Sequence, residues 1–271
     1  MIAETAKGPI EYRLEGIGPT VVVLNGGHCS RESRFSHEKL AACGFSVLTP
    51  SRPGYDSTPS SVGETARTAA DAIALLLDQL QISTVDMIGI SAAGPTALAF
   101  AQQHSERLRK LVLESAIATA WDEPIKRRSR LLFGRTQRLT WAVTRLALKL
   151  APKLTVQTMM RELTTLPVKP VMQQMGQHDF RFICQMLKTS QSGTGFMNDI
   201  EHYLDSLDGI TAPTLVMYSP HDSVVLPKHA KRIAASVKNC ECYEVPADSH
   251  LIWIGRFSKD VWYKRLSFLS S

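Results

Sequence analysis

A serine lies among very small residues in the segment Gly89-Ile90-Ser91-Ala92-Ala93-Gly94. An apolar run at 84–90 ends there and a helical pattern begins at 92, so a turn from strand to helix is predicted at Ser91. The small neighbours allow a sharp backbone turn and close helix packing, which leaves the hydroxyl accessible at the carboxyl edge of a sheet. The helix N-terminus adds free N–H groups and a partial positive charge. This setting favours a nucleophilic serine over a structural one.

Two further polar segments follow predicted strands. Residues 25–28 (Asn-Gly-Gly-His) follow an apolar run at 21–24, and residues 51–57 (Ser-Arg-Pro-Gly-Tyr-Asp-Ser) follow another at 45–49. With the serine segment, they resemble the α/β-hydrolase family, whose motifs at these places are a His-Gly pair, D-x-x-G-x-G-x-S and G-x-S-x-G. The chain departs from these motifs at Asn25, Ser51, Asp56 and Ala93. An alanine at the last position adds one methyl group, with which the turn remains feasible.

The resemblance implies a catalytic triad in the chain order serine, acid, histidine. Ser91 would be the nucleophile, Asp222 follows a predicted strand at 214–218, and His250 follows a predicted strand at 241–245. Carboxyl ends of parallel strands are where α/β sheets place their sites. His250 would accept the Ser91 proton and later protonate the leaving group. Asp222 would fix the histidine tautomer and stabilise the imidazolium.

The same resemblance implies an oxyanion hole built from the backbone N–H groups of Gly27 and Ala92. Loss of one such donor typically costs about 10²–10³ in rate. His28 would either line the site or hydrogen-bond to the backbone of its own turn. The segment 51–57 has a largely structural role in the family, so no chemistry is assigned to it.

Other residues compete for the acid and base roles. Glu114 ends a predicted strand at a position that some family members use for the acid, whereas Asp248 is expected to form a turn. Surface positions are expected for the remaining histidines: His37, His104, His178, His202, His221 and His229. No metal-binding spacing such as H-E-x-x-H occurs, so neither a metal nor another cofactor is expected.

Strand-like and helical patterns alternate along most of the chain. Short apolar runs predict strands at 21–24, 45–49, 84–90, 108–113, 214–218 and 241–245, and helices are predicted at 64–80, 92–104 and 228–237. This alternation predicts right-handed βαβ units. The expected fold class is therefore α/β, with a mostly parallel sheet covered by helices on both faces, which is the α/β-hydrolase fold of the resemblance.

The alternation stops between 121 and 200, where the pattern is helical and amphipathic. We expect a core of residues 1–120 and 201–271 and a helical insertion of residues 121–200, which the resemblance implies is a cap over the nucleophile. One stripe recurs at helical spacing at Leu139, Ala142, Val143, Leu146, Ala147 and Leu150, with Arg138, Arg145 and Lys149 off it. Methionines in this region indicate either an adaptable apolar pocket or ordinary packing between helices: Met159, Met160, Met172, Met175, Met186 and Met197.

The net charge of +6 is concentrated in this region, which holds 13 Lys and Arg residues against 5 Asp and Glu residues. The densest cluster is Lys126, Arg127, Arg128 and Arg130. Such a segment can attract nucleic acid, an anionic membrane or an anionic substrate, or it can be a solvated face. No nucleic-acid-binding module accompanies it, so no nucleic-acid partner is expected.

The overall composition, 44% hydrophobic and 21% charged, is typical of a soluble globular protein. No run approaches the roughly 20 apolar residues of a membrane-spanning helix, and residues 1–8 lack the pattern of a secretory signal. A cytoplasmic location without stable membrane insertion is expected. The five cysteines are expected to be free thiols.

These observations predict a hydrolase that cleaves a carboxylic ester or lactone through a covalent acyl-enzyme, acting on a small apolar or anionic molecule. A serine nucleophile argues against the dehalogenase and epoxide-hydrolase branches, which attack with aspartate. The same triad could instead cleave a C–C, amide or thioester bond or support perhydrolysis. A non-catalytic ligand receptor on the same scaffold also stays open, as does the oligomeric state.

Overall fold

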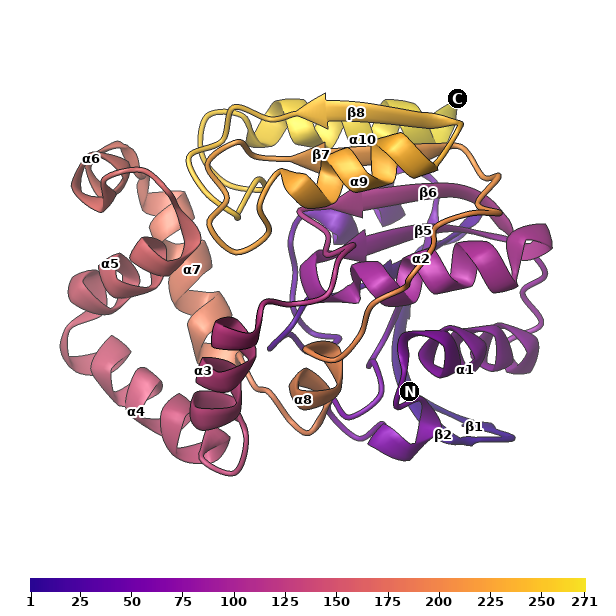
Figure 1. Cartoon of the computed structure of the whole chain (residues 1–271), viewed down its shortest axis with the longest axis horizontal. Coiled ribbons are helices and arrows are strands. Elements are labelled where there is room, and N and C mark those ends of the chain that lie inside the picture. The colour runs from indigo at the N-terminus through magenta and orange to yellow at the C-terminus, as the bar shows by residue number, and fades with distance from the viewer.

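A central sheet of eight strands organises the computed structural model, which describes residues 1–271 (Figure 1). The strands are β1 (Ile2–Thr5), β2 (Gly8–Glu15), β3 (Thr20–Leu24), β4 (Ser46–Pro50), β5 (Val85–Ile90), β6 (Leu108–Glu114), β7 (Thr214–Tyr218) and β8 (Cys240–Glu244). Their order in the sheet is β1-β2-β4-β3-β5-β6-β7-β8. Only β1 and β2 pair antiparallel to their neighbours, so the predicted mostly parallel sheet is confirmed. The sequence pattern missed these two strands because β2 buries only Ile10 and Tyr12 and has no continuous apolar run.

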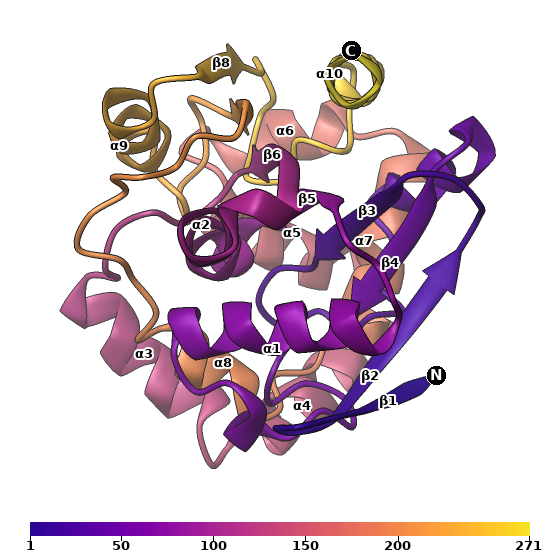
Figure 2. The same ribbon diagram turned by 90° about the vertical axis from the view of Figure 1, so that its right-hand side faces the viewer.

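Helices cover both faces of the sheet, as predicted (Figure 2). The helices α1 (Ala66–Gln79), α2 (Gly94–Gln103) and α9 (Lys228–Ser236) pack on one face, and α10 (Ser258–Ser270) packs on the other. Side chains alternate along each strand, so β3 contributes Val22 and Leu24 to one core and Val21 and Val23 to the other. The sheet is therefore buried on both sides and positions its carboxyl edge rigidly.

Six helices lie between β6 and β7, beyond the carboxyl ends of the parallel strands (Figure 1). They are α3 (Glu123–Phe133), α4 (Gln137–Leu150), α5 (Pro152–Leu163), α6 (Val168–Gln174), α7 (Gln177–Thr189) and α8 (Gly195–Asp199). We call this segment the helical insertion. None of the helices of the protein has the length and apolar character needed to cross a membrane.

The apolar stripe of α4 faces solvent. Trp141 and Leu148 are the buried residues of this helix, whereas Leu139, Val143, Leu146 and Leu150 are exposed. An amphipathic helix normally turns its apolar stripe toward the core. In α4 the stripe and the buried side are on opposite sides of the helix.

Candidate active site

Ser91 occupies a strained turn directly after β5. Its φ is +50°, and a short 3₁₀ turn over Ser91–Ala93 leads into α2. A side chain on Gly89 would place its Cβ 2.6 Å from that of Ala97, so a glycine is needed where helix and strand meet. Ala93 has an ordinary φ of −81°, which any residue can adopt, so the turn does not require the motif glycine here. The observed backbone outlier at Ser91 is the kind of strain that occurs at functional sites.

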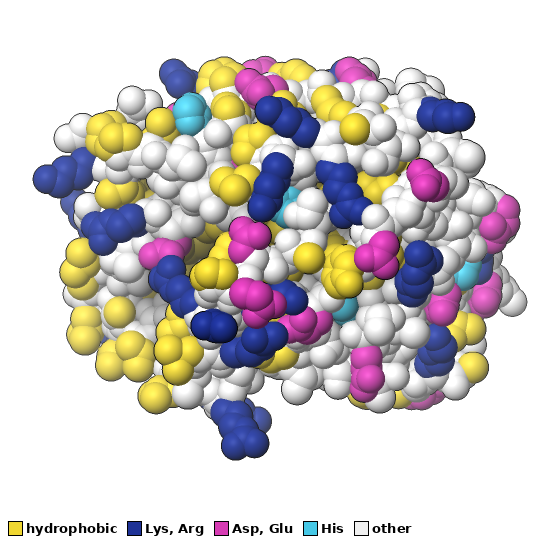
Figure 3. Space-filling view, viewed as in Figure 1, with side chains coloured by type: hydrophobic (Ala, Val, Ile, Leu, Met, Phe, Trp, Pro, Cys, Tyr) yellow, Lys and Arg dark blue, Asp and Glu magenta, His cyan; other side chains and the backbone are white.

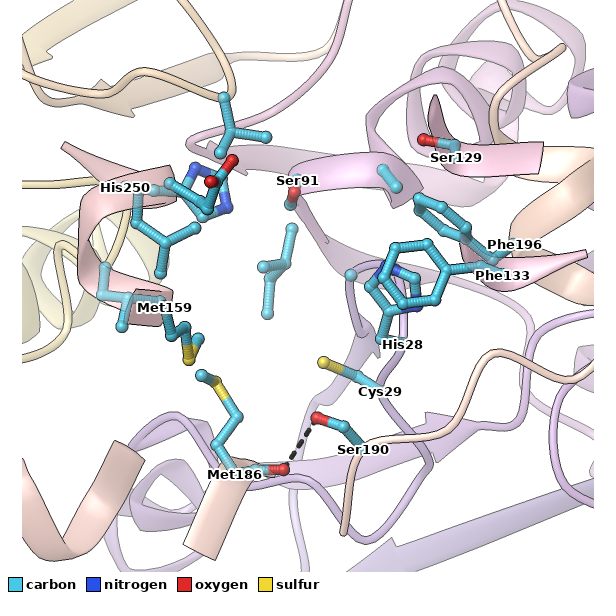
Figure 4. Close-up of a pocket in the computed structure, with 18 of the residues that line it drawn as sticks. His28, Cys29, Ser91, Ser129, Phe133, Met159, Met186, Ser190, Phe196 and His250 are labelled. Carbon is cyan, nitrogen blue, oxygen red and sulfur yellow. Dashed lines mark hydrogen bonds between the residues drawn. The ribbon is translucent and has the colours of Figure 1, made fainter. Parts of the chain in front are cut away.

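The structure brings His250 and Asp222 into contact. The Nδ1 atom of His250 lies 2.6 Å from Oδ2 of Asp222, a distance at which the ring N–H donates to the carboxylate. Asp222 is fully buried, and its Oδ1 accepts hydrogen bonds of 2.8 Å from the backbone N–H groups of Val224 and Val225. Both oxygens are thereby engaged, which fixes the carboxylate and orients the imidazole. Ser91 and His250 line the same cavity (Figure 4).

The segment between α5 and α6 connects the helical insertion to the two loops that carry Asp222 and His250. The backbone N–H of His250 donates to the carbonyl of Leu163 at 2.9 Å, and the N–H of Thr165 donates to the carbonyl of His221 at 2.9 Å. The hydroxyl of buried Thr164 donates to the carbonyl of Asp248. No motif marks these residues, so the sequence analysis did not find them.

Gly27 and Ala92, the expected oxyanion donors, lie close together. A Cβ on Gly27 would be 3.4 Å from that of Ala92 and 2.9 Å from the ring of Phe196, so only glycine fits without moving that ring. Asn25 replaces the motif histidine and holds this loop. Its amide donates to the carbonyl of Ser30 at 2.9 Å.

A buried ion pair between Arg52 and Asp199 contacts the loop that contains Asn25 and Gly27. Arg52 Nε donates to the carbonyl of Asn25 at 2.7 Å, and its Nη2 donates to Asp199 of α8 at 2.8 Å. The hydroxyl of Tyr55 donates to the same carboxylate at 2.6 Å. These contacts connect the 51–57 segment, the loop at Gly27 and the end of the insertion, a link that sequence motifs did not indicate.

His28 lines the cavity as an uncharged aromatic group. Its ring centroid lies 3.8 Å from that of Phe196 and 4.3 Å from that of Phe133. Its Nδ1 lies 2.9 Å from the hydroxyl of Ser192, so its polar partner is not the backbone of its own turn. Burial lowers the pKa of His28 to about 3, and the side chain is therefore neutral near pH 7.

The cavity has a volume of about 440 Å³, and 17 of its 27 lining residues are hydrophobic. The core supplies Ser91 and His250, and the insertion supplies much of the apolar wall: Trp121, Leu132, Phe133, Trp141, Met159 and Met186. Figure 4 shows Met159 and Met186 across the cavity from the group formed by His28, Phe133 and Phe196. Met160 is instead buried, and Met172 and Met175 pack against the core, so both interpretations of the methionines hold in part.

Charge at the cavity is confined to one ion pair. Arg128 and Glu162 are its only Arg, Lys, Asp or Glu lining residues, and their side chains are 2.7 Å apart and partly exposed. Two more cations of the predicted basic cluster, Lys126 and Arg130, pair with Glu201 at 2.7 and 2.6 Å. The cluster is therefore largely neutralised by its own neighbours.

Glu114 belongs to a separate buried network. It accepts hydrogen bonds from Arg265 Nε at 2.6 Å and from Trp253, and its Oε2 lies 2.9 Å from His37 Nε2. Burial alone would raise the pKa of Glu114, but Arg265 and His37 outweigh it and hold that pKa well below its usual range. These partners place Glu114 in a structural network, whereas Asp222 is the carboxylate that contacts His250.

The expected surface placement of the remaining histidines is wrong for three of them. His37, His202 and His229 are buried, because each has a polar partner within the fold. Nδ1 of His229 accepts the N–H of Ala118 at 3.0 Å, and Nε2 of His202 lies 2.9 Å from the carbonyl of Glu64. The periodicity around these residues gave no sign of such partners. All five cysteines are free, and no group of three or more His, Cys, Asp or Glu side chains is arranged to hold a metal ion.

Comparisons with known proteins agree with this architecture. The model of the alpha/beta hydrolase fold family matches residues 19–256. The chain is 30% identical over 272 residues to "Uncharacterized hydrolase YcgS" of Bacillus subtilis (strain 168), covering 97% of this chain and 96% of that protein. It superposes on a solved alpha/beta hydrolase fold protein from Nakamurella multipartita with a TM-score of 0.85 and 26% identity, covering 99% and 98% of the two chains.

A shorter similarity concerns a named activity. Over 110 residues the chain is 30% identical to 2-hydroxy-6-oxo-6-phenylhexa-2,4-dienoate hydrolase of Comamonas testosteroni, which covers 38% of each chain. The family match and the hydrolase relative together extend over nearly the whole chain. They show that this protein is a hydrolase and belongs to the α/β-hydrolase family.

Proposed function

We propose that the protein hydrolyses a carboxylic ester or lactone of a small, neutral and largely apolar molecule, with Ser91, Asp222 and His250 as its catalytic triad. One observation supports this most directly. The strained Ser91 shares a cavity with His250, whose Nδ1 lies 2.6 Å from the fully buried carboxylate of Asp222.

In this mechanism Ser91 attacks the ester carbonyl while His250 removes the proton from its hydroxyl. The negative charge that develops on the carbonyl oxygen is stabilised by the backbone N–H groups of Gly27 and Ala92. His250 then protonates the leaving alcohol, and an acyl-enzyme remains. A water molecule, deprotonated by the same imidazole, releases the acid, while Asp222 stabilises each imidazolium.

The helical insertion, which we assign to residues 121–200 between core segments 1–120 and 201–271, would act as a cap over the nucleophile. Its residues supply most of the apolar cavity wall, and such a wall shields the reacting groups from bulk water, which strengthens the electrostatic interactions at the triad. The paired state of Arg128 argues against an anionic substrate, because Glu162 already neutralises this cation. We place the protein in the cytoplasm, a reducing compartment that suits five free thiols.

C–C bond cleavage is the second candidate, favoured by the partial similarity to the dienoate hydrolase. A dienoate carries a carboxylate, which would need a cation or several donors inside the cavity. Arg128 is the only lysine or arginine that lines it, and its side chain is 62% exposed and paired. The charge pattern therefore supports a neutral ester over a dienoate.

The test labels the folded protein with a fluorophosphonate probe, followed by mass spectrometry, and measures turnover of neutral p-nitrophenyl esters in parallel. We expect one adduct on Ser91, with turnover lost in Ser91→Ala. Ser129→Ala is the matched control, because Ser129 also lines the cavity. An unlabelled Ser91 in folded protein would overturn the proposal in favour of a ligand receptor. Turnover of a dienoate and not of esters would favour C–C cleavage.

A further inference from the structure

The outward side of α4 is an exposed apolar surface. Leu139, Val143, Leu146 and Leu150 are 66%, 55%, 56% and 74% exposed. At about 100° per residue, these four positions form one stripe opposite the buried Trp141. Figure 3 shows apolar side chains gathered at the lower left of the molecule, where Figure 1 places α4. Single exposed leucines are common, but a continuous stripe on one helix indicates an interaction surface.

Positive charge lines this stripe without acidic partners. The sequence contains no Asp or Glu between Glu123 and Glu162. Several exposed cations of this stretch form no salt bridge, and four of them lie on α4 or within three residues of its ends and have no hydrogen-bond partner either: Arg135, Arg138, Lys149 and Lys153. This contrasts with α3, where three of the four basic residues are paired. We call the stripe and these four cations together the α4 face.

The charge pattern selects among possible partners. In a two-fold dimer built on the α4 face, the same unpaired cations would meet across the interface and repel each other. A nucleic acid would satisfy the cations but would leave the apolar stripe in water. An anionic phospholipid surface can bind both the apolar stripe and the cations, because the acyl chains bury the apolar side chains while the phosphate groups attract the cations.

We propose that the α4 face binds the surface of anionic phospholipid bilayers, with α4 lying in the plane of the headgroups. The binding is peripheral and does not depend on the function of Ser91. Trp141, on the opposite side of α4, lines the cavity. A docked bilayer would therefore lie about one helix diameter, roughly 10 Å, from the cavity.

The experiment is co-sedimentation of the full chain with vesicles of phosphatidylcholine alone or with about one third phosphatidylglycerol. We expect at least tenfold stronger binding to the anionic vesicles, weakened by added salt. The double variant Arg138→Gln/Lys149→Gln should lose about tenfold or more of this affinity, since each cation near an anionic surface contributes about fivefold. Leu146→Ser/Leu150→Ser should lose a similar factor.

Matched controls separate the α4 face from generic charge and hydrophobicity. Arg127→Gln removes an exposed cation on α3, and Ile17→Ser removes an apolar side chain that is 90% exposed elsewhere. Both should bind like the unmodified protein. The proposal is overturned if anionic vesicles do not bind, if the α4 variants bind as well as the controls, or if analytical ultracentrifugation instead finds a dimer that Leu146→Ser/Leu150→Ser dissociates.

Discussion

Helices α1 and α4 each contain 14 residues and each carry one apolar stripe, yet they present it to opposite environments. In α1 the stripe is buried against the sheet, where Ile73, Leu76 and Leu77 join the core. In α4 the stripe is exposed and Trp141 points inward, where its indole N–H donates to Ser192 at 2.8 Å. A helix that connects sheet strands packs with one face on the sheet, so its apolar stripe is buried there. Helix α4 of the insertion instead borders the cavity with its inner side, and its outer side faces solvent.

The two walls of the cavity, one from the core and one from the insertion, also differ in the side chains they present. The core wall carries the polar groups Ser91 and His250, the second held by its short hydrogen bond to Asp222, beside apolar side chains such as Phe35 and Trp253. The wall from the insertion is largely apolar apart from the Arg128–Glu162 ion pair, and it contains adaptable residues such as Met159 and Met186. We therefore expect substitutions in the core to affect chemistry or global stability, and substitutions on the insertion to affect binding or local positioning.

The largest effect is expected inside the core, from Asp222→Asn. The amide would favour the wrong tautomer of His250, and kcat for an ester should fall by about 10⁴-fold. Glu114→Gln is the comparison, since it breaks a buried network without touching His250. It should lower the free energy of unfolding by about 3–5 kcal/mol and leave kcat within a few-fold. Steady-state kinetics and denaturant unfolding measure both, and the reverse pattern would contradict our assignment of the acid.

The second effect compares the two helices directly. Leu77→Ala in α1 should lower the free energy of unfolding by about 2–5 kcal/mol, because it opens a cavity in the core. Leu146→Ala in α4 should change it by less than about 0.5 kcal/mol, because the side chain is already in solvent. Urea denaturation of the two variants measures the difference. Equal costs would show that the α4 stripe is buried in solution.

A smaller effect is expected where the insertion meets the loops of the triad. Thr164→Val removes the hydroxyl that donates to the carbonyl of Asp248, two residues before His250. We expect kcat to fall about tenfold with little change in KM, because a displaced base is poorly aligned. Thr164→Ser keeps the hydroxyl and should keep the rate. A loss in Thr164→Ser with the rate kept in Thr164→Val would point to packing of the methyl group instead.

The smallest effect concerns pH and His28. Its pKa is about 3 in the folded protein, against 6.5 as the ordinary value. As pH falls below 6.5 the unfolded chain takes up a proton that folded His28 refuses, so stability is full above pH 6.5 and is lost progressively toward pH 3. His28→Gln should reduce the slope of unfolding free energy against pH by up to about 1.4 kcal/mol per pH unit. Denaturant unfolding between pH 5 and 7.5 measures this, and an unchanged slope would show that His28 is not responsible.

The local sequence determined the elements that position the site. Apolar runs bounded by turns predicted β3 to β8 to within a residue or two, and the small residues around Ser91 predicted its turn. Period and turn chemistry are encoded within about ten neighbouring residues, which explains why these predictions could be made. Strands β1 and β2 and helix α10 were missed because none of them carries a strong local apolar pattern, and α10 even buries an arginine.

Tertiary structure alone decided which distant groups meet. Arg52 and Asp199 are 147 residues apart, and Arg265 reaches Glu114 across 151 residues. Burial of such charges depends on partners that no local pattern specifies. The orientation of α4 belongs to the same class, because its apolar stripe predicts a helix but not what lies on either side of it. Periodicity is local, whereas burial is a property of the packed whole.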